Sequence, residues 1–253
     1  MKLHHKILGE GEPLIILHGL FGTLDNWQTL AKKYAENFKV ILVDQRNHGH
    51  SPHSNEMSYE LMVEDLFELM NDLRIEKTNI IGHSMGGKTA MCFAQQYPGM
   101  VKKLVVADIG IKKYPPHHDV TFKSMLTMDL NVITTRKQAE EHIKTFFTDN
   151  VMILFLLKNL YWDDNQKLAW RMNLHVLHEK IENMMAGITQ LKCEVETLFV
   201  RGSKSNYITD EDFIEIKILF PVSSLSTLNT GHWVHAENPE VFYEVTMGFL
   251  TRI

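Results

Sequence analysis

A serine lies between two glycines where a run of β-branched residues gives way to a helical pattern, in the stretch NIIGHSMGGKTA at residues 79–90. A strand-to-helix turn this tight needs backbone angles that flanking side chains would obstruct, and glycine removes the obstruction. The spacing Gly82-x-Ser84-x-Gly86 is that of a nucleophile elbow, in which a strained turn presents a serine hydroxyl above the end of a parallel sheet. This stretch restricts the fold strongly, because it requires a strand, a turn and a helix in immediate succession.

Short β-rich runs alternate with longer helical patterns along the chain, and this alternation is typical of βαβ units. Most of these runs are continuously apolar, as strands covered on both faces must be. We therefore expect an α/β fold with a mostly parallel central sheet flanked by helices. The predicted strands are residues 2–8, 13–17, 39–44, 78–82, 103–108, 196–201 and 223–229.

Three of the predicted helices have clear boundary signals. Apolar residues recur at helical spacing after Ser58, which is suited to be an N-cap. A second helix is expected over residues 84–97, where a proline stops it. Asn238 precedes a proline and predicts the start of a last helix in the segment that runs to Ile253.

Residues 111–194 interrupt the alternation, with roughly 80 residues that contain helical patterns and no clear strand. A βα loop usually has about 2–6 residues. We therefore expect a helical lid, inserted between the strand that ends at Asp108 and the strand that starts near Glu196. The expected organisation is a core domain of residues 1–110 and 195–253 and a cap of residues 111–194. Most methionines and aromatic residues of the cap are expected to pack in its core, and a few are expected to line an acyl pocket.

Composition excludes several partners. The chain has 253 residues, of which 44% are hydrophobic, and a formal net charge of -5, so nothing favours nucleic acid or acidic membranes. The two cysteines lie outside any CxxC pattern. The N-terminal stretch has no apolar run of the kind that a signal peptide carries, and no apolar span of about 20 residues appears elsewhere. No acidic residue at the spacing of a hydrolytic metal motif accompanies the three histidines His48, His50 and His53, so a metal site is not expected there. We expect a cytoplasmic protein without cofactor or metal.

A serine is a poor nucleophile until a base takes its proton, and in this kind of fold the base is a histidine after the last strand. His232 has that position, between Gly231 and a predicted helix start. The turn after an early strand, LIILHGLFG, carries a His-Gly pair. The backbone N–H groups of Leu20 and Met85 are therefore expected to bind the oxyanion, with Phe21 as the alternative first donor.

The acid of such a triad must orient the histidine and stabilise its cation. The position usual for it, three or four residues past Gly202, holds Ser205 and an asparagine. The acidic residues 210–212 follow a threonine and are typical of a capped helix start. Asp108, at the end of the strand after the elbow helix, is therefore the predicted acid. Ser205 is an additional candidate partner of His232.

Five segments, HGLFGTLDNW, VDQRNHGHS, GHSMGGK, VVADI and GHWVHAE, resemble the small bacterial esterases of the YbfF type within the α/β-hydrolase superfamily. The similarity is spread over most of the chain. It implies an α/β-hydrolase fold that hydrolyses carboxylic esters or acyl thioesters, so the expected partner is a small-molecule ester or thioester. It also implies the acid at Asp108 and a serine at Ser205 near the histidine, and a structural turn around Asp44. We expect Phe21 and Trp233 in the substrate pocket.

Three functional classes share these residues. The first is a serine hydrolase of esters or thioesters. The second is a cofactor-free perhydrolase or a C–C bond hydrolase, and the third is a noncatalytic α/β-hydrolase that binds a small ligand. Fold alone does not separate them. A dehalogenase or an epoxide hydrolase would need a carboxylate at the apex of the elbow, which Ser84 excludes.

Overall fold

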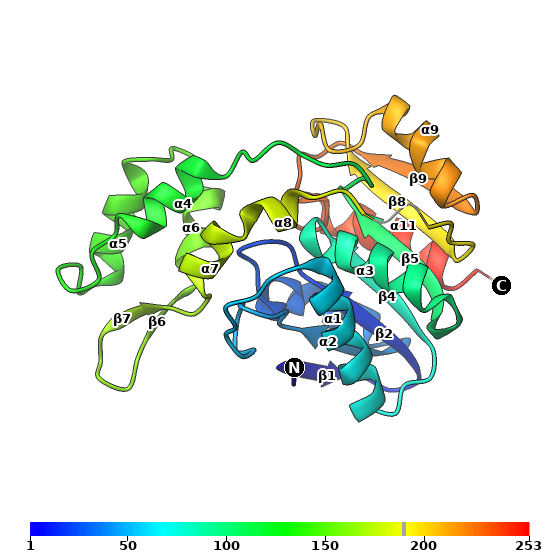
Figure 1. Cartoon of the computed structure of the whole chain (residues 1–253), viewed down its shortest axis with the longest axis horizontal. Coiled ribbons are helices and arrows are strands. Elements are labelled where there is room, and N and C mark those ends of the chain that lie inside the picture. Colours follow the sequence, from blue (N-terminus) through cyan, green and yellow to red (C-terminus); the bar gives the residue numbers. More distant parts are fainter. Residues whose placement is uncertain (189–190, 253) are drawn as a thin grey trace.

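The computed structural model describes residues 1–188 and 191–252. A seven-stranded sheet forms its centre, in the order β1-β3-β2-β4-β5-β8-β9 (Figure 1). β1 is antiparallel to β3, and the other neighbours are parallel. The strands are β1 (His5–Leu8), β2 (Glu12–Leu17), β3 (Phe38–Val43), β4 (Thr78–His83), β5 (Val101–Ala107), β8 (Glu196–Gly202) and β9 (Ser223–Leu228).

The seven predicted strands and the mostly parallel sheet are confirmed, with small shifts at the strand ends. Alternate residues of β2 show why the runs are apolar throughout. Ile15 and Leu17 belong to one hydrophobic cluster, whereas Leu14 and Ile16 belong to another on the opposite face. Both faces are therefore covered, as continuous apolar strands require.

Helices cover the two faces of the sheet. One cluster contains side chains of α2 (Tyr59–Asp72), α3 (Met85–Gln96) and α9 (Asp210–Leu219). The other contains side chains of α1 (Gln28–Tyr34), which follows the short η1 (Leu24–Trp27), and of α11 (Pro239–Leu250). The remaining core helices are the short η2 (Pro98–Met100) and α10 (Val234–Glu237).

Two of the predicted helix caps, Ser58 and Asn238, are confirmed. The Ser58 hydroxyl accepts a hydrogen bond from the Leu61 N–H at 3.4 Å, and the Asn238 side chain caps α11 through Val241. The last helix was expected in the segment to Ile253; α11 ends at Leu250, and Ile253 lies outside the described residues. In the part of the chain that the structure describes, no helix is both long enough and apolar enough to cross a membrane. The expected cytoplasmic location stays a prediction.

Residues 111–194, called the cap segment here, lie between β5 and β8. Figure 1 shows most of this segment to one side of the sheet. Its helices are α4 (Asp119–Leu126), α5 (Arg136–Lys144), α6 (Asn150–Leu157), α7 (Leu174–Glu179) and α8 (Ile181–Met185). Their buried side chains, including Phe122 and Leu156, continue one of the two core clusters.

The expectation of a strandless cap segment is wrong at one place. β6 (Leu160–Trp162) and β7 (Leu168–Trp170) form an antiparallel hairpin. Its turn is held by the Asp163 carboxylate, which accepts hydrogen bonds from the N–H groups of Asn165 and Lys167 at 2.9 and 2.7 Å. Strands of three residues are too short to show the alternation by which a strand is recognised in a sequence.

The two connections between cap segment and core lie side by side. The N–H of Tyr114 donates to Met185 O at 2.9 Å, and that of Ile188 donates to Ile111 O at 3.0 Å. Lys88 of α3 is 1% exposed, and its ammonium donates to the carbonyl of Lys112 at 2.9 Å and to that of Ala186. One buried lysine therefore joins both connections to the elbow helix.

Candidate active site

Ser84 lies at the junction of β4 and α3. Its backbone has φ +51° and ψ -119°, a conformation that L-residues rarely adopt and that marks stored strain. Its side chain does not cap α3. Between Thr78 and Met91, Ser84 is the one residue that is not buried. The turn thus brings a hydroxyl to the surface from a segment that is otherwise entirely core.

Glycines let three pieces of backbone meet at this turn. A Cβ on Gly82 would lie 2.3 Å from Gly86 O, and one on Gly86 would lie 2.5 Å from Leu17 O. A Cβ on Gly19 would lie 2.8 Å from His83 Nδ1 and 3.2 Å from Ser84 Cβ. Side chains at these positions would force the elbow away from the loop after β2.

Asp108 directly follows β5 and is completely buried, with φ +49°. Its Oδ2 accepts a hydrogen bond from His232 Nδ1 at 2.8 Å and another from the Ser205 hydroxyl. Its Oδ1 accepts from the Gly202 N–H at 2.9 Å. A carboxylate that binds Nδ1–H leaves Nε2 of the imidazole as the proton acceptor. Ser205 therefore contacts the acid, not His232 itself.

The loop that carries His232 is fixed against the elbow. His83, the residue before Ser84, donates a hydrogen bond from its Nε2 to His232 O at 2.9 Å, and the centres of the two imidazole rings are 4.7 Å apart. On its other side, the His232 ring stacks on Tyr207, with ring centres 4.0 Å apart and planes 19° from parallel. The Tyr207 hydroxyl has a pKa raised to about 12, because it is buried.

The contact of Tyr207 with the His232 ring was not expected from the sequence. It lies in the loop SKSNY after β8, where no periodicity marks it. The Tyr207 N–H donates to Ser205 Oγ at 3.3 Å, and its carbonyl accepts from the Tyr114 hydroxyl at 2.6 Å. Only the packing of this loop over His232 reveals its role in holding the ring.

The loop after β2 carries one of the two expected oxyanion donors, Leu20, and the other, Met85, is the first residue of α3. The Gly19 carbonyl accepts hydrogen bonds from the Gly22 N–H at 3.0 Å and from His18 Nδ1 at 2.8 Å, and this fixes the peptide that bears the Leu20 N–H. In residues 1–188 and 191–252, neither the Leu20 N–H nor the Met85 N–H has an acceptor within the protein. The alternative donor, Phe21, is engaged, since its N–H donates to His48 Nε2 at 3.3 Å.

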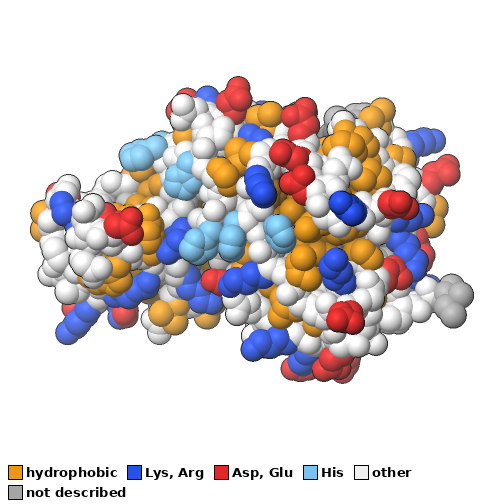
Figure 2. Space-filling model, turned by 90° about the horizontal axis from the view of Figure 1, so that it is seen from below, with side chains coloured by type: hydrophobic (Ala, Val, Ile, Leu, Met, Phe, Trp, Pro, Cys, Tyr) orange, Lys and Arg blue, Asp and Glu red, His pale blue; other side chains and the backbone are white. Residues whose placement is uncertain are grey.

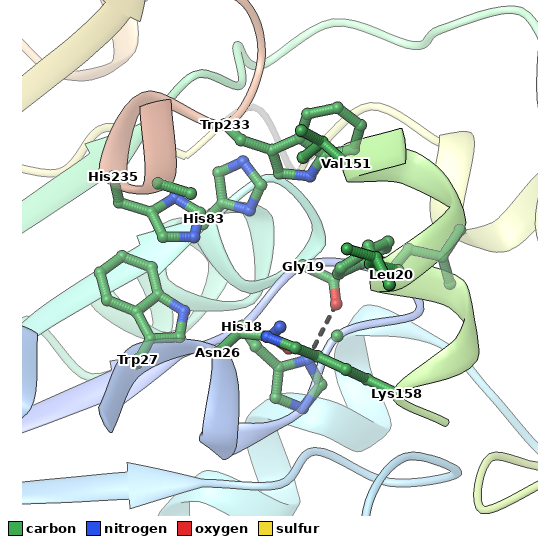
Figure 3. A pocket seen from close by; sticks show the side chains of 14 residues that line it. His18, Gly19, Leu20, Asn26, Trp27, His83, Val151, Lys158, Trp233 and His235 are labelled. Carbon is green, nitrogen blue, oxygen red and sulfur yellow. Dashed lines mark hydrogen bonds between the residues drawn. The ribbon is translucent and has the colours of Figure 1, made fainter. Parts of the chain in front are cut away.

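A pocket of about 310 Å³ opens beside the elbow (Figure 3). Trp233 is among the residues that line it, and the place of Trp233 in the substrate pocket stays a prediction. Phe21 is 3% exposed and has a different place, with its ring edge-to-face on Phe122 of α4. Its carbonyl accepts from the amide of Asn159 at 2.8 Å. The pocket is lined by His18, Gly19, Leu20, Gly22, Asn26, Trp27, His83, Val151, Leu154, Phe155, Lys158, Trp233, His235 and Ala236.

The other carboxylates considered for the triad have structural roles. Asp210 and Asp212 lie in the first turn of α9, and Thr209 caps this helix, as its sequence indicates. Asp210 pairs with Arg201 at 2.7 Å and is 81% exposed at its side chain. Asp212 pairs with Lys112 at 2.6 Å. Neither faces His232 in the way that Asp108 does.

The histidines near residue 50 contact protein groups. His48 Nδ1 lies 2.9 Å from Arg46 O, and His50 Nδ1 lies 3.1 Å from an Arg171 guanidinium nitrogen. His53 Nε2 lies 2.9 Å from Arg171 O. Figure 2 shows histidines gathered at the middle of one face of the molecule. His50 and His53 thus connect the core to the end of the β6–β7 hairpin.

Comparison with known proteins identifies the family of the chain. The family model described as alpha/beta hydrolase fold matches residues 12–152. Esterase YbfF of Escherichia coli is 31% identical over 94% of this chain and 92% of that protein. The sn-1-specific diacylglycerol lipase ABHD11 of Danio rerio is 36% identical over 96% of this chain and 79% of that protein. A solved structure of a marine microorganism esterase is 42% identical, with a TM-score of 0.96, over 98% of this chain and 99% of that one. The resemblance to YbfF-type esterases is confirmed.

Proposed function

Because the chain belongs to the α/β-hydrolase family, in which its relatives are esterases and lipases, we propose that it cleaves its ester substrates through a covalent acyl-enzyme on Ser84. The chain is a hydrolase of small-molecule esters. Acyl thioesters react by the same steps, and we include them in the proposed substrate class.

The proposed mechanism assigns one role to each residue of the site. His232 takes the proton of Ser84 as its hydroxyl attacks the carbonyl carbon, and then gives this proton to the leaving alcohol or thiol. Asp108 holds the imidazole in the required tautomer and stabilises its cation. Water then attacks the acyl-enzyme, with His232 as the base again, and the acid is released.

The oxyanion of each tetrahedral intermediate is assigned to the N–H groups of Leu20 and Met85. A donor of this kind contributes about 2.7–4 kcal/mol where it has been measured in other enzymes. Hydrogen bonds to Gly19 O hold the Leu20 peptide in place before substrate arrives. We propose that the cap segment covers this site as a lid, with α6 over the pocket.

The hydrogen bond of 2.8 Å between His232 Nδ1 and Asp108 Oδ2, at the edge of the sheet where the elbow lies, carries this proposal. The test is active-site labelling. A fluorophosphonate should add covalently to Ser84 in the wild type, and peptide mass spectrometry locates the adduct. Ser84→Ala should fold with an unchanged melting temperature, lose the adduct, and lose more than about 10⁴-fold in kcat on an aryl acetate. An adduct on another residue, or an active Ser84→Ala protein, would contradict the assignment.

A further inference from the structure

The pocket beside the elbow has two chemically different parts. Val151, Leu154 and Phe155 of α6, with Leu20 and Trp233, make an apolar wall. The other part carries polar side chains, including Asn26, Trp27 and Lys158, and Figure 3 shows these three close to one another. The residues that line the pocket include no carboxylate.

Lys158 is the one charged side chain among these lining residues. Burial favours the uncharged form of the three histidines of the pocket, because it lowers the pKa of His18 and of His83 and brings that of His235 to about 3. Within the described chain, Lys158 has no carboxylate partner. Figure 3 shows its side chain extended across the pocket toward Asn26.

Two further hydrogen-bond donors lie at the same end. Trp27 is 1% exposed, and its Nε1 is a buried donor with no partner in the described part of the chain. The Asn26 Oδ1 accepts from the Thr23 N–H at 2.7 Å, which leaves the amide NH₂ for another acceptor. Buried donors are normally paired, so an unpaired one in a pocket wall indicates an acceptor on the ligand.

We propose that this end of the pocket binds a carboxylate that the ester substrate carries several bonds from its scissile carbonyl. An ionised carboxylate only accepts hydrogen bonds, and the side-chain groups of Trp27, Asn26 and Lys158 supply donors together with one positive charge. The apolar wall then contacts the methylene chain between the two ends. This subsite rests on the proposed function, since it selects among the esters that Ser84 attacks.

The test compares matched substrates. Aryl hemiesters of glutaric, adipic and pimelic acids carry the terminal carboxylate at increasing reach, and the corresponding terminal amides are neutral and nearly isosteric. The measured quantity is the ratio of kcat/KM for the acid to that for the amide, at low and at high salt. In the wild type, this ratio should exceed one for at least one chain length and should fall with salt.

Variants test whether Lys158 supplies the positive charge that favours the acid over the amide. Lys158→Met should lower the ratio about two- to fivefold, as expected for an ion pair made by an exposed lysine, and Lys158→Glu should lower it further. Trp27→Phe removes the indole N–H and should also lower it. Lys167→Met, at an exposed lysine in the β6–β7 turn, is the matched control and should leave the ratio unchanged.

Each outcome bears on one proposal. If the folded wild type hydrolyses neither series, the proposed function fails. If it hydrolyses both series but the ratio is the same in the wild type and in Lys158→Glu, the carboxylate subsite is refuted while the esterase stands. If an aryl ester with a terminal phosphate of equal reach gains more from Lys158 than any hemiester does, the assignment to a carboxylate is wrong.

Discussion

Replacing Asp108 by asparagine tests the least obvious residue of the proposed triad. The substitution keeps the shape of the side chain and its burial. Oδ2, however, accepts from both His232 Nδ1 and the Ser205 hydroxyl, and Oδ1 accepts from the Gly202 N–H. An amide NH₂ cannot accept a hydrogen bond. Whether it takes the place of Oδ1 or of Oδ2, it therefore faces at least one group that donates. With the NH₂ toward His232, the imidazole must turn to the tautomer whose Nε2 carries the proton.

A histidine in that tautomer cannot take the proton of Ser84. In a serine protease, the equivalent change lowers kcat about 10⁴-fold, which corresponds to about 5.4 kcal/mol of transition-state stabilisation. We expect a loss of this order for Asp108→Asn. Ser205→Ala removes one hydrogen bond to the carboxylate and leaves the bond to His232, so about a two- to tenfold loss is expected.

Asp210→Asn is the control. The Asp210 side chain is 81% exposed and pairs with Arg201, and exposed pairs contribute about 0–1 kcal/mol to stability. The assay measures kcat on an aryl acetate at neutral pH, together with the melting temperature of each variant. The order of activity should be Asp210→Asn, then Ser205→Ala, then Asp108→Asn. A folded Asp210→Asn protein without activity, beside a fully active Asp108→Asn protein, would refute the reasoning.

Two further predictions concern the packing around the elbow. Gly19→Ala should lower kcat about 10²- to 10³-fold, because its Cβ would lie 2.8 Å from His83 Nδ1 and displace the proposed oxyanion loop; Gly99→Ala, with nothing within 4 Å, is the control, and equal activity of the two variants would contradict the prediction. Burial lowers the pKa of Lys88 from 10.5 to about 8, so the folded protein releases this proton at lower pH than the unfolded chain, and stability from this group rises between about pH 8 and 10.5. The free energy of unfolding of the wild type minus that of Lys88→Met should therefore increase over this range, by at most about 1.4 kcal/mol per pH unit. Urea unfolding of both proteins at pH 7, 8, 9 and 10 measures this difference. A difference that stays constant with pH would contradict the prediction.

Local signals in the sequence determined much of the fold. The apolar runs predict the strands because residues on both faces of this sheet are buried, and the caps Ser58, Thr209 and Asn238 act within a few residues of their own positions. The elbow turn is local at Gly82, where a Cβ would lie 2.3 Å from Gly86 O and obstruct the turn that strains Ser84. Each of these features depends on neighbours along the chain, and a single sequence contains that information.

Contacts between distant segments were decided only by the tertiary structure. Asp108 and His232 are 124 positions apart, and they meet because the parallel strands β5 and β9, which precede them, end at the same edge of the sheet. The chain order suggested Asp108, yet nothing in the sequence placed Tyr207 on the His232 ring or Ser205 on the acid. The polar end of the pocket likewise joins residues 26 and 27 to residue 158 of the cap segment. Hydrogen bonds and ring contacts act over a few ångströms, so which side chains share them depends on how strands and helices pack.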